Sequence, residues 1–138
     1  MTQEQTTRKP LIMLVDDDED ILSVFSKYFS QQGYNVHAFS NPEMAYEHFK
    51  YSPNECAVVI SDVRMPGMTG FQLTRKLKEL NSDVKVILMS AFEISVAEFR
   101  SVLPHAPVDG FLEKPVSLKK LDELVKNLVS AEVTQSMY

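Results

Sequence analysis

The amino-acid sequence predicts an α/β fold with a doubly wound, five-stranded parallel sheet of strand order 2-1-3-4-5 and five helices. Short apolar runs alternate with segments of helical periodicity five times along the chain. The apolar runs are continuous instead of alternating with polar residues, which is typical of strands buried on both faces. Because parallel strands need crossover connections, the intervening helices should cover both faces of the sheet.

Each strand is expected where a short apolar run stops at a polar or turn-forming residue. The expected strands are Leu11–Val15, Asn35–Phe39, Val58–Asp62, Val84–Met89 and Val108–Leu112. The expected helices run from the acidic stretch after Val15 to Gly33, from Pro42 to about Tyr51, from Thr69 to Leu80, over Glu93–Leu103, and from Ser117 to about Ala131. Ser40 with Glu43 and Thr69 with Gln72 are capping-box pairs that should begin the second and third helices.

Composition indicates one domain without a targeting or membrane segment. The net charge of −5 and a pI near 5.2 argue against binding to nucleic acid, which needs a basic surface. The only cysteine, Cys56, cannot form an internal disulfide, and the longest apolar run is too short to span a membrane. We expect a cytoplasmic protein with a flexible polar arm at 1–9, one domain at 10–131 and a tail at 132–138.

Three acidic residues should meet at one edge of the sheet. Asp16 and Asp17 follow the first strand and Asp62 ends the third, and these two strands are neighbours in the predicted order. Two ionised carboxylates about 4 Å apart repel by about 4 kcal/mol at an effective dielectric constant near 20. Either one pKa rises or a divalent cation offsets the charge, and ligands that are all oxygen favour Mg²⁺.

A hydroxyl and an ammonium group are predicted at the same edge. Ser90 ends the fourth strand and Lys114 follows the fifth. Mg²⁺ in proteins commonly binds one or two carboxylates together with phosphate oxygens. A carboxylate nucleophile, a metal, a cation and a hydroxyl are the groups needed to accept a phosphoryl group on Asp62.

Four separated motifs together resemble the receiver domain of bacterial and archaeal response regulators. The resemblance covers about residues 10–131 and implies a flavodoxin-like, CheY-like fold. The motifs are Val15-Asp16-Asp17-Asp18, the loop Asp62-x-x-Met65-Pro66-x-Met68-x-Gly70, the pair Ser90-Ala91, and Lys114-Pro115.

The resemblance implies a signalling domain that is not an enzyme beyond its own phosphorylation and dephosphorylation. Asp62 would take the phosphoryl group from a phosphohistidine on a sensor histidine kinase or a phosphotransfer protein. Asp17, Asp62 and the backbone carbonyl of Arg64 would bind Mg²⁺, with Asp16 acting mainly through water. Ser90 and Lys114 would contact the phosphoryl oxygens. The structural positions implied by the motifs are Pro66, Gly70 and Pro115, with a cis bond between Lys114 and Pro115.

A conformational switch is also implied by the resemblance. Ser90 would move toward the phosphoryl group and Phe111 would swing inward, which changes the face formed by the fourth helix, fifth strand and fifth helix. That face would contact a downstream protein or an output domain that this chain does not carry. Phe111 stands where the family more often has Tyr, so the switch would signal through packing and not through a phenol hydroxyl.

Two other functions fit parts of the pattern. A haloacid-dehalogenase-type phosphatase would use Asp16-x-Asp18 as its nucleophile motif, with a later Ser and Lys. However, Asp20 stands where Thr or Val is expected, no acidic pair follows Lys114, and the chain is short for that fold. A receiver-fold interaction module that is never phosphorylated is the second alternative, and the intact acidic site argues against it.

Arg64 and Phe92 lie two residues after Asp62 and Ser90, at positions that the resemblance places beside the attacking water. A long cation and a bulky ring there should shield the acyl phosphate. We therefore expect Arg64→Ala and Phe92→Ala to speed loss of the phosphoryl group, followed as the decay of the phosphorylated mass. Unchanged decay in both variants would contradict the shielding role.

Overall fold

The computed structural model describes residues 9–91 and 108–137, and within them a five-stranded parallel sheet. The strand order is β2-β1-β3-β4-β5, as predicted, and all four pairings are parallel. The strands are β1 (Leu11–Val15), β2 (Asn35–Phe39), β3 (Cys56–Asp62), β4 (Lys85–Ser90) and β5 (Gly110–Glu113). The predicted fold class is therefore confirmed, with strand ends that differ by one or two residues in β3, β4 and β5.

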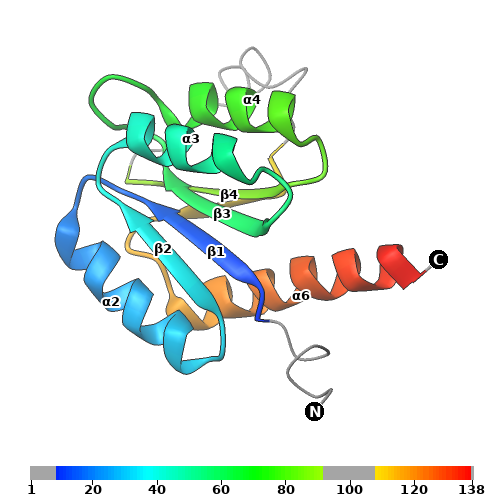
Figure 1. Ribbon diagram of the computed structural model, residues 1–138. Helices are drawn as coiled ribbons and strands as arrows, with labels where there is room; N and C mark the ends of the chain where they lie inside the picture. The colour runs from blue at the N-terminus through cyan, green and yellow to red at the C-terminus, as the bar shows by residue number, and fades with distance from the viewer. Residues whose placement is uncertain (1–8, 92–107, 138) are drawn as a thin grey trace.

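Helices cover both faces of the sheet (Figure 1). Helices α3 and α4 lie over one face, and α2 and α6 lie over the other. The described helices are α2 (Glu19–Gln31), α3 (Pro42–Tyr51), α4 (Gly70–Leu80) and α6 (Leu118–Met137). The helix expected at Glu93–Leu103 lies outside the described residues. No helix in the described part of the chain combines the length and the apolar character needed to cross a membrane.

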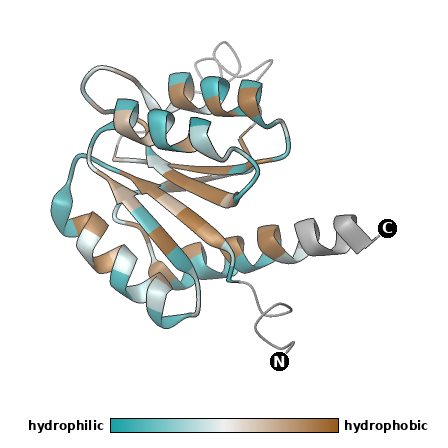
Figure 2. Ribbon diagram, in the orientation of Figure 1, coloured by the Kyte–Doolittle hydropathy of each residue, from teal (hydrophilic) through white to brown (hydrophobic). Residues whose placement is uncertain are grey.

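Two hydrophobic cores lie on opposite faces of the sheet, as the hydropathy colouring of Figure 2 illustrates. Side chains alternate in direction along a strand, so β1 contributes to both cores. Met13 and Val15 pack with the core beneath α3 and α4, whereas Ile12 and Leu14 pack with the core beneath α2 and α6. This two-sided burial explains why the strand sequences are continuous apolar runs.

The helix ends agree with the sequence prediction in some places and correct it in others. The capping box of Thr69 and Gln72 is present at the start of α4. Helix α3 is capped by Asn41 and not by Ser40, because Asn41 directly precedes Pro42 at the first helical position and accepts hydrogen bonds from the next turn. Helix α6 continues past the predicted end near Ala131 to Met137, because no Gly or Pro follows to stop it.

Gly70 allows α4 to begin directly against the backbone of the loop that follows β3. Its amide donates a hydrogen bond to the Val63 carbonyl at 2.8 Å. A Cβ atom at Gly70 would collide with the carbonyl oxygen of Asp62 and would lie 3.0 Å from the Val63 Cα and 3.1 Å from the Leu88 Cδ2. A glycine is thus required for this close approach, which fixes the backbone at the end of β3.

We expect Gly70→Ala to lower the free energy of unfolding by about 1–3 kcal/mol, because the added methyl group overpacks a rigid backbone contact. Urea unfolding monitored by circular dichroism measures the change. Glu79→Ala, at an exposed position of the same helix, is the control and should change stability by less than about 0.5 kcal/mol. Equal stability of Gly70→Ala and the native chain would show that the loop can move aside.

Candidate functional site

Three carboxylates meet where β1 and β3 end. Asp16 directly follows β1 and donates its backbone N–H to the Phe39 carbonyl at 3.1 Å, while Asp62 is the last residue of β3. One oxygen from each of Asp16, Asp17 and Asp62 lies within 4.8 Å of the others. Asp16 is 1% exposed and Asp62 is 8% exposed, whereas Asp17 faces solvent. The convergence predicted from the strand order is therefore present.

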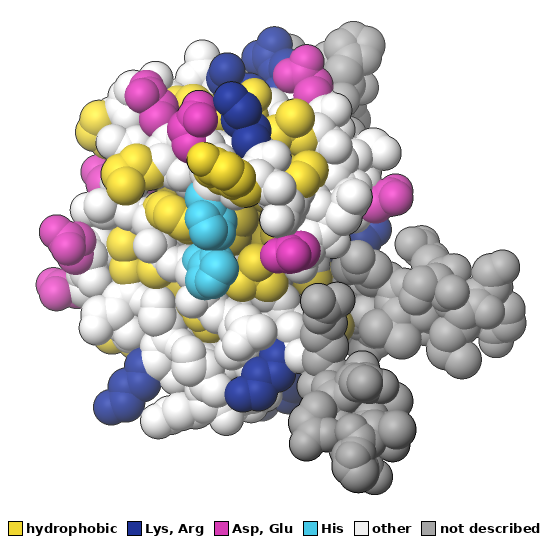
Figure 3. All heavy atoms as spheres, viewed as in Figure 1, with side chains coloured by type: hydrophobic (Ala, Val, Ile, Leu, Met, Phe, Trp, Pro, Cys, Tyr) yellow, Lys and Arg dark blue, Asp and Glu magenta, His cyan; other side chains and the backbone are white. Residues whose placement is uncertain are grey.

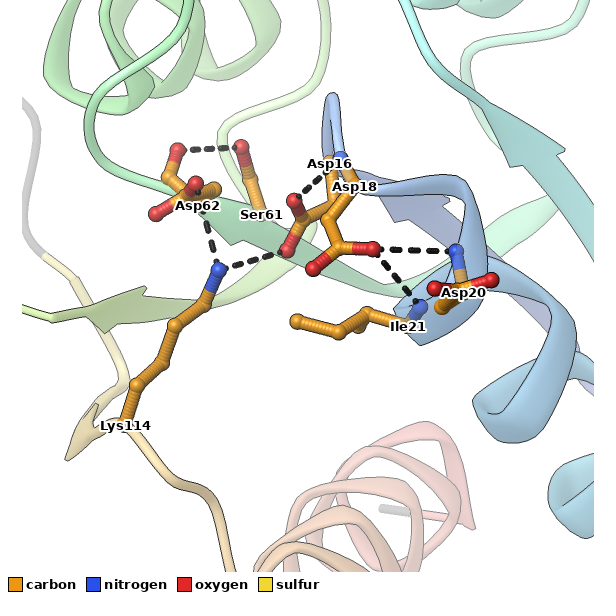
Figure 4. Close-up of polar contacts among 7 residues, drawn as sticks. All are labelled: Asp16, Asp18, Asp20, Ile21, Ser61, Asp62 and Lys114. Carbon is orange, nitrogen blue, oxygen red and sulfur yellow. Dashed lines mark hydrogen bonds and ion pairs between the residues drawn. The ribbon is translucent and has the colours of Figure 1, made fainter.

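Lys114 reaches the two buried carboxylates from the end of β5 (Figure 4). Its Nζ lies 2.9 Å from Asp16 Oδ2 and 3.3 Å from Asp62 Oδ2. The backbone N–H of Lys114 donates to the Ser90 carbonyl at 2.8 Å, which ties the lysine loop to the end of β4. The peptide bond between Lys114 and Pro115 is cis. The lysine is thus anchored through its backbone and directed between two acids.

The proximity of these groups changes their proton affinities. Burial raises the pKa of Asp62 above its ordinary value of 3.8, and the charge of Asp16 raises it further, while Lys114 opposes both effects. Burial tends to lower the pKa of Lys114, but the hydrogen bond and charge of Asp16, with those of Asp62, outweigh burial and raise that pKa above its ordinary value. The ammonium group therefore stays charged, and the charge on Asp62 is only partly compensated.

The composition of the site fits a hard divalent cation. Three carboxylates and one ammonium give a formal charge of −2, which a divalent ion would neutralise. The clustered donors are all carboxylate oxygens, which Mg²⁺ prefers over nitrogen or sulfur. The predicted Mg²⁺ ligands Asp16, Asp17 and Asp62 are therefore placed together, and Arg64 lies exposed in the loop directly after β3.

The remaining predicted residues lie on the neighbouring strands and loops. Ser90 is buried at the end of β4, where it pairs with Glu113 of β5. Phe111 lies opposite Leu88 in the adjacent strand and packs, partly buried, against the core on the side of α3 and α4. Pro66 is exposed in the loop between β3 and α4, whereas Phe92 falls outside the described residues.

Some functional contacts were not expected from the sequence. The shortest ion pair of Lys114 is with Asp16, which was expected to take part in Mg²⁺ binding mainly through water. The Ser61 hydroxyl donates a hydrogen bond to the Asp62 carbonyl at 2.9 Å. Asp18 is the N-cap of α2, and its side chain accepts hydrogen bonds from the backbone N–H groups of Asp20 and Ile21. The capping role of Asp18 could have been predicted from its position directly before the helix. The ion-pair partner of Lys114 could not, because it depends on the path of the chain after β5.

A family profile covers nearly the whole described domain. The profile described as "Response regulator receiver domain" matches residues 12–126. Every site residue discussed above lies inside this match.

Curated relatives include both short regulators and long kinases. The response regulator receiver protein CpdR of Brucella abortus (strain 2308) is 32% identical over 122 residues, covering 87% of this chain and 98% of that protein. The sensor kinase CckA of the same organism is 32% identical over 121 residues, covering 88% of this chain but 13% of the kinase. The sensor kinase/phosphatase LuxN of Vibrio campbellii is 30% identical, with 94% of this chain and 15% of that protein covered. The chain thus spans a small part of the kinases that it matches.

Solved structures share the fold. A CheY-like response regulator receiver domain protein from Methanospirillum hungatei JF-1 superposes with a TM-score of 0.83 at 23% identity, covering 93% of this chain and 99% of that one. A response regulator receiver protein from Pseudomonas putida gives a TM-score of 0.76 at 26% identity, covering 87% and 98%.

The raised pKa of Asp62 predicts that ionised Asp62 destabilises the metal-free protein. Between the ordinary value of 3.8 and the higher folded-state value, the folded chain holds a proton that the unfolded chain has released. Stability therefore falls as the pH rises through this range. We expect Asp62→Asn to raise the denaturation midpoint in chelator at neutral pH, and to have little effect below the ordinary value, where the native carboxyl is protonated in both states.

Asp83→Asn, at an exposed aspartate before β4, is the control and should leave the midpoint unchanged at both pH values. Added Mg²⁺ should stabilise the native chain more than Asp62→Asn, because the variant lacks one carboxylate. A lower midpoint for Asp62→Asn at neutral pH would contradict the electrostatic account.

Proposed function

Because the chain belongs to the response regulator receiver family, a family of signalling domains, we propose that Asp62 accepts a phosphoryl group from a phosphohistidine donor. The observation that carries this proposal is the convergence of three carboxylates and Lys114 at one edge of the sheet. Asp62 ends β3 and keeps 8% exposure, against 1% for Asp16, so of these two buried carboxylates it is the one that a donor approaching from solvent can meet.

In the proposed transfer, one carboxylate oxygen of Asp62 attacks phosphorus. A P–O bond to Asp62 forms as the P–N bond to the donor imidazole breaks, and the imidazole nitrogen takes up a proton. Charge spreads over the equatorial phosphoryl oxygens in the transition state, so the reaction depends mainly on positioning and electrostatic stabilisation. Asp62 must be ionised to attack, which its raised pKa opposes and the neighbouring Lys114 ammonium favours.

Lys114 is placed to serve both the resting and the phosphorylated site. Its ammonium lies between Asp16 and Asp62, so it can follow the negative charge from the carboxylate to a phosphoryl oxygen. Ser90, at the neighbouring strand end, is proposed to donate its hydroxyl to another phosphoryl oxygen. Asp16, Asp17, Asp62 and the Arg64 carbonyl would hold Mg²⁺, which supplies positive charge opposite the phosphoryl oxygens when bound.

We further propose that phosphorylation changes the packing of Phe111. The ring lies on the strand that leads to Lys114 and is only partly buried against the core on the side of α3 and α4, so an inward movement would bury it further. Movement of Ser90 toward the phosphoryl group and of Phe111 toward the core would change the surface that includes β5 and α6. A downstream protein or a separate output domain would read that surface.

The phosphate donor is proposed to be a sensor histidine kinase or a histidine phosphotransfer protein in the cytoplasm. The relatives named sensor kinases carry a segment similar to this chain within a much longer protein. This similarity supports a place in kinase signalling but not a particular kinase. A phosphatase with Asp16 as nucleophile is not favoured, because Asp16 is 1% exposed and is paired with Lys114.

We expect the intact mass to increase by one phosphoryl group after incubation with a small acyl phosphate donor and Mg²⁺. Asp62→Asn should show no adduct, and a chelator should prevent adduct formation on the native chain. Asp83→Asn is the matched control and should be phosphorylated like the native chain, because Asp83 lies at the other end of the sheet, before β4.

The outcomes separate the candidate functions. Steady release of phosphate from a phosphate ester would favour a phosphatase. A missing adduct in a folded protein that forms a stable beryllium-fluoride complex would indicate a short-lived phosphoryl group. A missing adduct without such a complex would overturn phosphoacceptor function and favour a phosphorylation-independent module.

A further inference from the structure

Two histidines are in contact between the edge strand β2 and helix α3, away from the acidic site. His37 lies in β2 and His48 lies in α3, and His37 Nδ1 is 2.9 Å from His48 Nε2. Figure 3 shows the two imidazoles side by side on the viewed face, with hydrophobic side chains around them. From the sequence, neither histidine was expected to be a ligand, because their separation in the chain matches no metal-binding motif.

The two rings are held by the elements that carry them. In β2, His37 and Phe39 are two residues apart and so face the same side of the sheet, which is the side covered by α3. The centroid of the His48 ring lies 5.2 Å from that of Phe39 and 4.8 Å from that of His37. The planes of the two histidine rings are at 82° to each other. The next helix residue, Phe49, is buried in the core and fixes the helix against the strand.

A direct contact between two ring nitrogens requires that at least one of them present its lone pair. A neutral imidazole has one N–H and one acceptor nitrogen, so a single proton can lie between Nδ1 and Nε2. A metal ion that displaces that proton can bind both nitrogens once the two rings turn so that their lone pairs point at the ion, and neutral imidazole is a common ligand of transition metals in proteins.

We propose that His37 and His48 form a binding site for a borderline transition-metal ion, best matched by Ni²⁺ or Cu²⁺. Imidazole nitrogens bind such ions at about 2.0–2.1 Å, so nitrogens 2.9 Å apart subtend about 90° at the metal. This angle is that of neighbouring ligands in octahedral or tetragonal complexes. A tetrahedral zinc site would need the nitrogens about 3.4 Å apart.

A hollow of about 130 Å³ lies beside the pair and leaves space for water ligands. Its lining is mostly apolar and includes both histidines and the carboxylate residue Glu55. Among residues 9–91 and 108–137, only the acidic cluster brings three ligand atoms of these types together. The histidine pair would therefore bind the ion through two nitrogens, and water would complete the coordination.

The nitrogen pair and the acidic cluster prefer different metals. Oxygen ligands select hard ions such as Mg²⁺, whereas imidazole selects Ni²⁺, Cu²⁺ and Zn²⁺. The two sites can therefore be examined independently. Excess Mg²⁺ occupies the carboxylates and leaves the histidines available to a second metal.

The test is calorimetric titration of the tag-free chain with Ni²⁺ in excess Mg²⁺. We expect one Ni²⁺ per chain, and an affinity on the order of 100-fold weaker in His37→Ala and in His48→Ala, since each variant keeps one of two joined ligands. His105→Ala removes the chain's third histidine and should bind Ni²⁺ like the native protein. Equal affinities in all four proteins would overturn the proposal.

Two further measurements complete the test. The first uses the native chain and so does not depend on folding of the variants, and the second checks whether the Cys56 thiol is the ligand. Paramagnetic Ni²⁺ added to the native chain should broaden the imidazole NMR signals of His37 and His48 before those of His105. Broadening of His105 first, or of no histidine, would overturn the site. Loss of Ni²⁺ binding in Cys56→Ser but not in the histidine variants would also overturn it, by placing the ligand at the thiol.

Discussion

The parallel pairing of β1 with β3 is the constraint on which the site depends. Val15 pairs with Ser61, so the residues that follow, Asp16 and Asp62, leave the sheet side by side at the same edge. Parallel strands deliver all their carboxyl ends to one edge, and the change of winding direction between β1 and β3 keeps crossover helices away from it. The two hydrophobic cores hold this sheet from both sides, so the carboxylates cannot relax apart without moving buried strands.

That constraint forces like charges together, and the chain compensates for only part of the repulsion. Lys114 neutralises one of three negative charges, and its position is fixed by a backbone hydrogen bond to Ser90 at the end of β4. Burial and, after it, the charge of Asp16 raise the pKa of Asp62 despite the opposing effect of Lys114. A site that is electrostatically unsatisfied when empty is suited to bind a divalent cation and the phosphoryl group that follows it. The histidine pair on β2 and α3 differs in kind, because its contact joins ring nitrogens and brings no carboxylates together.

Local sequence signals predicted the helices and strands well where an apolar run, a capping pair or a glycine marked them clearly. The apolar runs of β1 and β3, the capping box at Thr69 and the positive φ of Gly33 at the end of α2 all follow from local preferences. The helix ends were wrong in two places, for two different reasons. Ser40 and Asn41 are both good caps, and Pro42 decides for Asn41 by fixing the first helical position. The end of α6 was misplaced because a polar composition was interpreted as a tail, although nothing in it stops a helix.

By itself, the sequence predicted the edge at which Asp16, Asp17, Asp62, Ser90 and Lys114 gather and the all-oxygen character of the acidic cluster, because these follow from strand ends in a parallel sheet of the commonest five-stranded order. Only the tertiary structure decided that Lys114 bonds most closely to Asp16, that Gly70 must lack a side chain, and that His37 meets His48. Each of these depends on how closely separate elements approach one another in space, where a difference of a few tenths of an ångström decides the contact. Local periodicity and propensity carry no information on such distances.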